Sequence, residues 1–256
     1  MPTTKITFTG SLGAQLAANL DEPEGSVRAY AMFAHCFTCS KDVIAASRIS
    51  RALAKLGIGV LRFDFTGLGN SEGDFADTTF SSNIGDLVVA ADWLRTNRAA
   101  PCILIGHSLG GAAVMMAASQ IPECKAVATI GAPADPKHVI HLFDSSADEI
   151  EQHGRADVSI GGRPFTVGQQ LIDDLRDQSP QERIGSLKRA LLVFHSPVDT
   201  VVGVENAAQI FAWAKHPKSF VSVDGSDHML TKPKDADFVA TMLSAWAERY
   251  APAGGS

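Results

Sequence analysis

The stretch Ile-Leu-Ile-Gly-His-Ser-Leu-Gly-Gly at residues 103–111 passes within a few positions from an apolar run to a serine flanked by glycines. Helix-forming residues, Ala-Ala-Val-Met-Met-Ala-Ala, follow at 112–118. A G-x-S-x-G sequence between a strand and a helix is typical of the nucleophile elbow, a turn so sharp that its flanking positions have to be glycine. In such a turn the Ser108 hydroxyl stands exposed above the strand, near the free N–H groups that begin the helix. The motif therefore predicts a nucleophilic serine, whereas a plain Gly-Ser turn would leave its exposure unexplained.

Two later apolar runs end on residues that could activate this serine. The run at 190–199 ends on Asp199, and the run at 219–228 ends on His228. The order Ser, Asp, His, with the acid and the base each placed after a late strand, is the order that accompanies this kind of elbow. His228 would act as general base, and Asp199 would fix the tautomer of its ring and stabilise the imidazolium. We therefore expect Ser108, Asp199 and His228 to be the catalytic residues.

Other acids and bases are also available. Asp135 follows an earlier strand and is the rival acid. His107 lies inside the elbow and His35 ends another strand, so we interpret both as structural hydrogen-bonding residues. His138 and His141 are not spaced as a helical pair of metal ligands. The sequence therefore predicts no metal site and no cofactor.

The backbone N–H groups that would stabilise an oxyanion are expected at two places. Leu109 follows the nucleophile, and Phe37 lies in the loop after the strand at 30–35. Cys36 stands directly after His35, at a position where a glycine is common, which makes Phe37 the weaker of the two assignments.

Cys36 and Cys39 also form a C-x-x-C motif between a strand and a helix, the arrangement of a thioredoxin-like redox site. Thiol redox chemistry is therefore an alternative function. The complete Ser-Asp-His set and the missing proline-flanked redox signature argue against it, and we expect two buried packing cysteines.

Composition limits the class of protein. The chain has 256 residues, 45% of them hydrophobic, and a net charge of −6. A single domain over residues 1–250 can bury a large core, and residues 251–256 are expected to be a disordered tail.

There is no apolar run of about 20 residues, no signal sequence and no basic run. Four irregularly spaced cysteines fit a reducing compartment. We expect a soluble, cytoplasmic protein without a nucleic-acid or membrane partner; the composition leaves its oligomeric state open.

The order of elements predicts an α/β fold, with a mostly parallel, doubly wound sheet and an N-terminal hairpin. Active-site residues of such sheets collect at the carboxyl ends of the strands. We expect strands at 5–9, 15–20, 28–34, 59–63, 102–105 and 126–130, and helices at 41–56, 81–94 and 110–121.

The alternation stops between residues 135 and 187. Helical pieces at 136–153 and 167–177 flank a hairpin at 156–166 that turns at Gly161-Gly162. Such an insertion would overhang the elbow as a lid or cap, although a passive surface excursion is the alternative. The substrate-binding residues expected here and beside the base are Leu142, Phe143, Phe165 and Met229.

Three segments, 35–42, 61–73 and 130–136, resemble the hydrolase half of bacterial proteins in which an α/β-hydrolase domain is fused to an OsmC-like peroxide-reducing domain. The resemblance to an α/β-hydrolase extends over essentially the whole chain. It implies a serine hydrolase of esterase type, with Ser108, Asp199 and His228 at the triad positions. Thr66 stands where the wider superfamily more often has arginine, so a charge near the site is missing. The peroxidase activity of the fused relatives does not carry over.

The expected reaction is acyl transfer from a small-molecule ester to Ser108, followed by hydrolysis of the acyl-enzyme. Small to medium carboxylic esters are the leading substrate class, thioesters the next and peptides the third. A C-x-x-C redox protein and a non-catalytic binding module are the alternatives from other classes.

Overall fold

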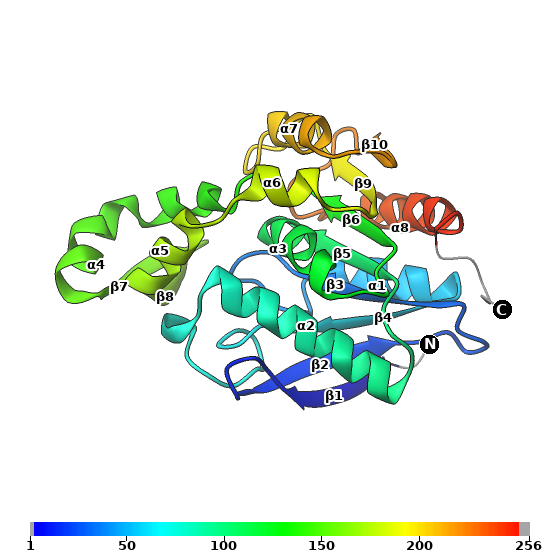
Figure 1. The fold of residues 1–256 in the computed structure, drawn as a ribbon, viewed down its shortest axis with the longest axis horizontal. Helices are drawn as coiled ribbons and strands as arrows, with labels where there is room; N and C mark the ends of the chain where they lie inside the picture. The colour runs from blue at the N-terminus through cyan, green and yellow to red at the C-terminus, as the bar shows by residue number, and fades with distance from the viewer. Residues whose placement is uncertain (1–2, 251–256) are drawn as a thin grey trace.

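The computed structural model describes residues 3–250 and is built around a single large sheet (Figure 1). Its strands are β1 (Thr3–Thr9), β2 (Gln15–Asp21), β3 (Ala29–Ala34), β4 (Ile58–Phe63), β5 (Ile103–His107), β6 (Ala126–Ile130), β9 (Ala190–His195) and β10 (Lys218–Ser222). They lie in the order β1-β2-β4-β3-β5-β6-β9-β10. The first two strands form an antiparallel hairpin, and the sheet from β4 to β10 is parallel. The α/β prediction is thus confirmed.

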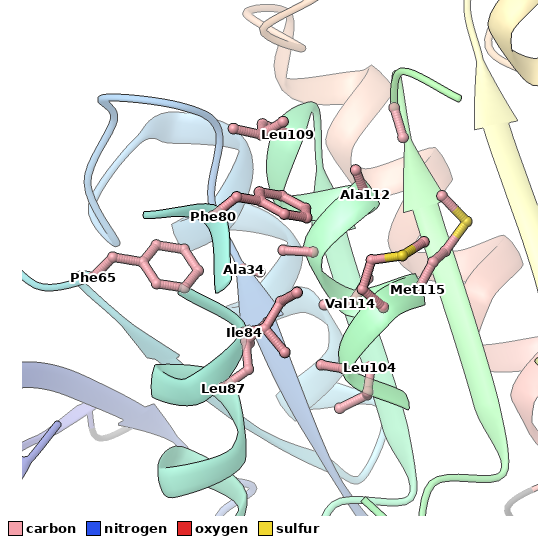
Figure 2. Packing of buried hydrophobic residues seen from close by; sticks show 14 of the residues in the cluster. Ala34, Phe65, Phe80, Ile84, Leu87, Leu104, Leu109, Ala112, Val114 and Met115 are labelled. Atoms are coloured by element: carbon pink, nitrogen blue, oxygen red, sulfur yellow. The ribbon is translucent and has the colours of Figure 1, made fainter. Parts of the chain in front are cut away.

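Helices cover both faces of the sheet because alternate side chains of each strand point to opposite faces. On β5, Ile103 and Ile105 face one buried cluster, whereas Leu104 faces the other. The first face packs against α1 (Ile44–Lys55) and α8 (Pro233–Ala247). The second packs against α2 (Phe80–Asn97), α3 (Leu109–Ala117), α6 (Pro180–Gly185) and α7 (Glu205–Trp213). Figure 2 shows Phe80 and Ile84 of α2 meeting α3 above β5.

Helix α1 begins at Ile44, later than the expected start at Lys41. The backbone N–H of Lys41 donates to Oδ1 of Asp64 at 2.5 Å, and its ammonium group binds Oδ2 at 2.9 Å. These contacts tie Lys41 to the segment that follows β4, so it belongs to the loop and not to the helix. None of the helices within residues 3–250 is long and apolar enough to cross a bilayer.

The insertion between β6 and β9 projects from one end of the sheet (Figure 1). It contains a 3₁₀ helix (Pro136–Ser146), α4 (Ala147–His153), the hairpin strands β7 (Arg155–Ile160) and β8 (Arg163–Gly168), and α5 (Gln169–Arg176). The hairpin turns at Gly161 and Gly162, as expected, and both have positive φ, 58° and 77°. Val167 continues β8 instead of starting a helix, because it pairs with Ala156 across the hairpin. The predicted tail at 251–256 lies outside the described residues.

Candidate active site

The elbow between β5 and α3 holds Ser108 in the left-handed region, with φ 54° and ψ −128°. A Cβ on Gly106 would lie 2.2 Å from the carbonyl oxygen of Gly110, and one on Gly110 would lie 2.4 Å from that of Ala34. Neither gap admits a side chain, so both flanking positions have to be glycine. The Ser108 N–H donates to the carbonyl of Ile130 at 2.9 Å, which ties the strained turn to the next strand.

Asp199 and His228 meet at the carboxyl end of the sheet. Nδ1 of His228 lies 2.7 Å from Oδ2 of Asp199. Since a carboxylate can only accept, Nδ1 carries the proton and Nε2 is left as the basic nitrogen. The fold therefore brings together an acid and a base, and the base is in the tautomer that can accept a proton from a hydroxyl.

The Asp199 carboxylate is held in the charged form. Its side chain is only 2% exposed, and burial by itself would raise its pKa. The hydrogen bond from His228 and two backbone N–H donors, those of Val201 and Val202 at 2.9 Å to Oδ1, outweigh burial and lower the pKa of Asp199 below its ordinary value. The ring of His228 therefore faces a full negative charge.

Three further histidines hold the loops around this pair. His107 Nε2 donates to the carbonyl of His228 at 2.7 Å, and burial lowers the pKa of His107 to about 4, so the ring stays neutral. His35 Nδ1 lies 2.8 Å from the carbonyl of Cys36, which agrees with the structural interpretation of both residues. His195 Nε2 binds the carbonyl of Val202 at 2.8 Å. The sequence predictions do not include His195, although its place at the end of β9, just ahead of Asp199, is a usable signal.

The β3–α1 loop, residues 35–43, contains a disulfide between Cys36 and Cys39. The expectation of two free packing thiols is therefore wrong. The Cys39 N–H donates to the Cys36 carbonyl at 3.1 Å, and this turn brings the two Cα atoms to 5.3 Å, within the range that a disulfide needs. The free thiols are those of Cys102 and Cys124. With one bond formed, the cysteines no longer indicate a reducing compartment.

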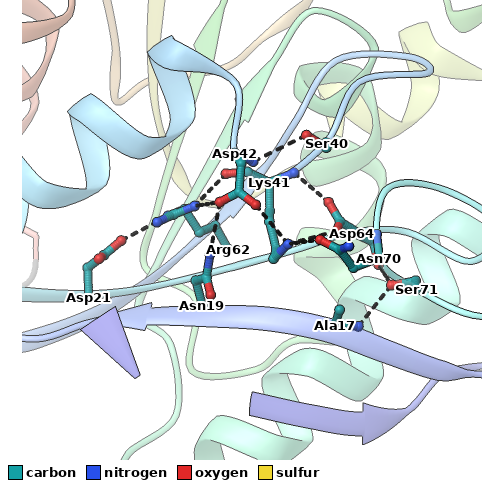
Figure 3. Close-up of polar contacts among 10 residues, drawn as sticks. All are labelled: Ala17, Asn19, Asp21, Ser40, Lys41, Asp42, Arg62, Asp64, Asn70 and Ser71. Atoms are coloured by element: carbon teal, nitrogen blue, oxygen red, sulfur yellow. Dashed lines mark hydrogen bonds and ion pairs between the residues drawn. The ribbon is translucent and has the colours of Figure 1, made fainter. Parts of the chain in front are cut away.

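A polar network anchors the end of this loop (Figure 3). The Lys41 ammonium group binds Asp64, whose side chain is fully buried, and also Asp42. Arg62, itself 1% exposed, donates to the Lys41 carbonyl at 2.7 Å and to Asp21 at 2.9 Å. Because breaking a buried pair leaves an uncompensated charge, this network fixes the path of the chain between β3 and α1.

A cavity of about 300 Å³ opens over the elbow. Ser108 and His228 lie in its wall, together with the whole C-x-x-C segment and the tip of the β7–β8 hairpin. Leu142 and Met229, two of the expected substrate-binding residues, also line it.

The other two expected substrate-binding residues have a packing role instead. Phe143 is 1% exposed, and its ring centre lies 6.1 Å from that of Phe37. The ring of Phe165 packs on Phe75 at 5.2 Å. Leu142 and Phe143 are neighbours on a helical turn, so the aromatic ring points into the core while the leucine points out.

The rival acid, Asp135, has a different environment. Its Oδ1 accepts the N–H of Lys137 at 2.9 Å, as the cap of the 3₁₀ helix. It borders a separate hollow with Ser179 and Trp213. The carboxylate that contacts the His228 ring is that of Asp199.

Comparisons with known proteins agree with this fold. The family model described as serine aminopeptidase, S33, matches residues 25–152, half of the chain. The solved esterase domain from Rhodothermus marinus is 47% identical, with a TM-score of 0.80 over 98% of this chain and 100% of that one. The chain therefore belongs to the serine aminopeptidase, S33, family of the α/β-hydrolase superfamily, whose members are serine hydrolases.

Two further relatives are more distant. Human mitochondrial palmitoyl-protein thioesterase ABHD10 is 32% identical over 107 residues, 42% of this chain and 34% of that protein. The chain thus spans about a third of the length of the curated relatives that it matches first. Est1E from Butyrivibrio proteoclasticus, solved with ferulic acid, is 18% identical with a TM-score of 0.80 over 96% of this chain and 98% of that one, a likeness of fold.

Proposed function

We propose that the chain is a carboxylesterase that cleaves small to medium acyl esters through an acyl-serine intermediate on Ser108. The observation that carries the proposal is the 2.7 Å contact of Asp199 with His228, a residue that lines the same cavity as Ser108. Identity of 47% to a solved esterase domain supports the ester class.

In the proposed reaction Nε2 of His228 takes the Ser108 proton as the oxygen attacks the ester carbonyl. Leu109 is the first residue of α3, so its backbone N–H has no acceptor within the helix and is available to the oxyanion. Phe37, in the disulfide-closed loop beside the cavity, supplies the second N–H. His228 then protonates the leaving alcohol and later activates the water that releases the acid.

A thioesterase acting with the same residues is the second candidate, because the curated relatives that match residues of this chain carry that activity in their names. The two are separated by offering an oxygen ester, a thioester and an anilide of the same hexanoyl group. We expect the oxygen ester to have the highest kcat/KM and the anilide the lowest. A thioester turned over faster than the oxygen ester by about ten-fold or more would favour the thioesterase.

The insertion acts as a lid in this proposal, and Leu142 limits the length of the acyl group. Leu142→Ala removes a side chain that lines the cavity, so the ratio of kcat/KM for decanoyl over butyryl esters should rise about ten-fold. Leu12→Ala, in the exposed turn after β1, is the matched control and should leave the ratio unchanged. The same acyl preference in both variants would mean that this part of the insertion is a passive excursion.

The disulfide, by contrast, is expected to be dispensable for hydrolysis. His35 and Arg163 also hold the loop, through the carbonyls of Cys36 and Thr38. Cys39→Ser should therefore keep kcat/KM within about three-fold, with a loss of about 2 kcal/mol in the free energy of unfolding, since the closed ring is short. Cys102→Ser controls for the loss of a thiol elsewhere.

The same variants test the redox alternative. Thiol-dependent peroxide reduction should be at background for the wild-type protein. Peroxide turnover that disappears in Cys39→Ser and survives in Ser108→Ala would favour the redox protein instead.

A further inference from the structure

Arg163 begins β8, at the tip of the insertion's hairpin, and lines the cavity that contains Ser108 and His228. The turn at Gly161-Gly162 sets it directly opposite Ile160, which lines the cavity as well. The exposed Arg163 side chain therefore places a permanent positive charge on the largely apolar cavity that also contains the proposed nucleophile.

No acidic residue of residues 3–250 lies within ion-pair distance of this charge. The ionisable residues in the cavity wall are Arg163 and the histidines 138, 141 and 228, with no aspartate or glutamate among them. No carboxylate of residues 3–250 forms an ion pair with the Arg163 guanidinium within 4.0 Å. Asp199 is committed to His228 and to two backbone N–H groups. The electrostatics of the cavity thus favour an anion.

The guanidinium is held in place but keeps free donors. Its Nη2 donates to the carbonyl of Thr38, and its Cζ lies 5.4 Å from the centre of the Phe165 ring. A guanidinium has five N–H groups, so these contacts leave several for a ligand. Arg163 is exposed, and these two contacts restrict its side chain, so binding costs less side-chain entropy than it would for an arginine without contacts.

We propose that Arg163 selects esters that carry a carboxylate remote from the scissile carbonyl. The planar fork of a guanidinium matches a carboxylate in two parallel hydrogen bonds. The cavity of about 300 Å³ that Arg163 and Ser108 share is lined mostly by apolar residues, which suit the chain that joins the two groups. The inference rests on the proposed function, since it names the substrate class of that same site.

A simpler role for Arg163 is a latch between the hairpin and the β3–α1 loop, through Thr38. A latch positions Phe37 for every substrate alike, so its loss lowers the turnover of neutral and anionic esters by the same factor. Selection of an anion changes their ratio. The ratio of kcat/KM for an anionic ester over its neutral match therefore distinguishes the two roles.

The experiment uses two matched pairs of esters on the full chain. In the acyl arm, the p-nitrophenyl monoester of adipic acid is compared with p-nitrophenyl hexanoate. In the leaving-group arm, p-carboxyphenyl hexanoate is compared with its methyl ester. Each pair is measured with the wild type, Arg163→Gln, Arg163→Lys and Arg155→Gln. Arg155→Gln is the control because Arg155 is an exposed arginine of the same hairpin, as Arg163 is, but does not line the cavity.

Arg163→Gln should lower the anionic-over-neutral ratio of kcat/KM about ten-fold in one of the two arms. The arm that responds identifies whether the acyl group or the leaving group of the substrate carries the anion. Arg163→Lys should retain most of the ratio, and Arg155→Gln all of it. Raising the ionic strength to about 0.5 M should reduce the wild-type ratio but not that of Arg163→Gln. An equal fall for both members of each pair, or an unchanged ratio in both arms, overturns the inference and leaves the esterase intact.

Failure of the proposed function has a different signature, namely no hydrolysis in either arm and no fluorophosphonate adduct. Binding then decides the inference by itself. Ser108→Ala, which cannot turn the ligands over, should bind monomethyl adipate about ten-fold more tightly than dimethyl adipate in calorimetry, and this difference should vanish when Arg163→Gln is added. Equal affinities for the two ligands would overturn the inference.

Discussion

Ser108→Ala is expected to lower kcat for ester hydrolysis by about 10⁴-fold or more, with little change in KM. The reason is that only the hydroxyl that attacks the carbonyl is lost, while the cavity and its lining stay in place. Alanine tolerates the φ of 54° about as well as serine does, so the fold should persist. Initial rates on p-nitrophenyl hexanoate measure the effect, and thermal unfolding of the variant serves as the control for folding.

Turnover within about ten-fold of the wild type, in a variant that unfolds at the same temperature, would show that another group attacks the ester. Ser108→Cys is the useful companion. It keeps a nucleophile at the elbow. Acylation of this cysteine without efficient hydrolysis of the acyl-enzyme would still show that residue 108 attacks the ester.

Asp199→Asn should lower kcat by about 10⁴-fold as well, although the shape of the site is preserved. An asparagine can turn its N–H₂ toward the His228 ring, and Nδ1 then becomes the acceptor. The proton moves to Nε2, where the serine needs a base. Loss of the carboxylate also removes the charge that stabilises the imidazolium.

Asp135→Asn is the matched control for this prediction. Asp135 caps the 3₁₀ helix of the insertion through Lys137, and asparagine is an equally good cap, so the loss should be less than about three-fold. A large loss in Asp135→Asn together with a small one in Asp199→Asn would move the acid to the end of β6. Both variants are compared at saturating ester so that kcat alone is read.

The parts of the site that follow strands could be predicted from the sequence because strand ends have local signals. The elbow is contained in a few consecutive residues, and Asp199 and His228 each follow an apolar run. Parallel strands then bring their carboxyl ends to one edge, so separate signals converge without any knowledge of the loops. The hairpin turn at Gly161-Gly162 was equally local.

Features that depend on contacts between distant segments could not be predicted in this way. The disulfide needs the turn of the β3–α1 loop, and the start of α1 depends on Asp64, which lies beyond the helix in the chain. Arg163 and the proposed nucleophile line one cavity only because the tip of the hairpin and the elbow, far apart in the chain, meet there. The opposite roles of Leu142 and Phe143 depend on which face of the 3₁₀ helix is turned toward the core. Two adjacent apolar residues do not indicate that face.

The most direct test of an acyl-serine mechanism is the site of covalent labelling. The wild-type protein is incubated with a fluorophosphonate, and the adduct is located by intact mass and then by peptide mass spectrometry. We expect one adduct per chain on Ser108, its loss in Ser108→Ala, and much slower labelling in His228→Ala because the base that activates the hydroxyl is missing. An adduct on any other residue, or none on a protein that hydrolyses esters, would contradict the assignment of Ser108 as the nucleophile.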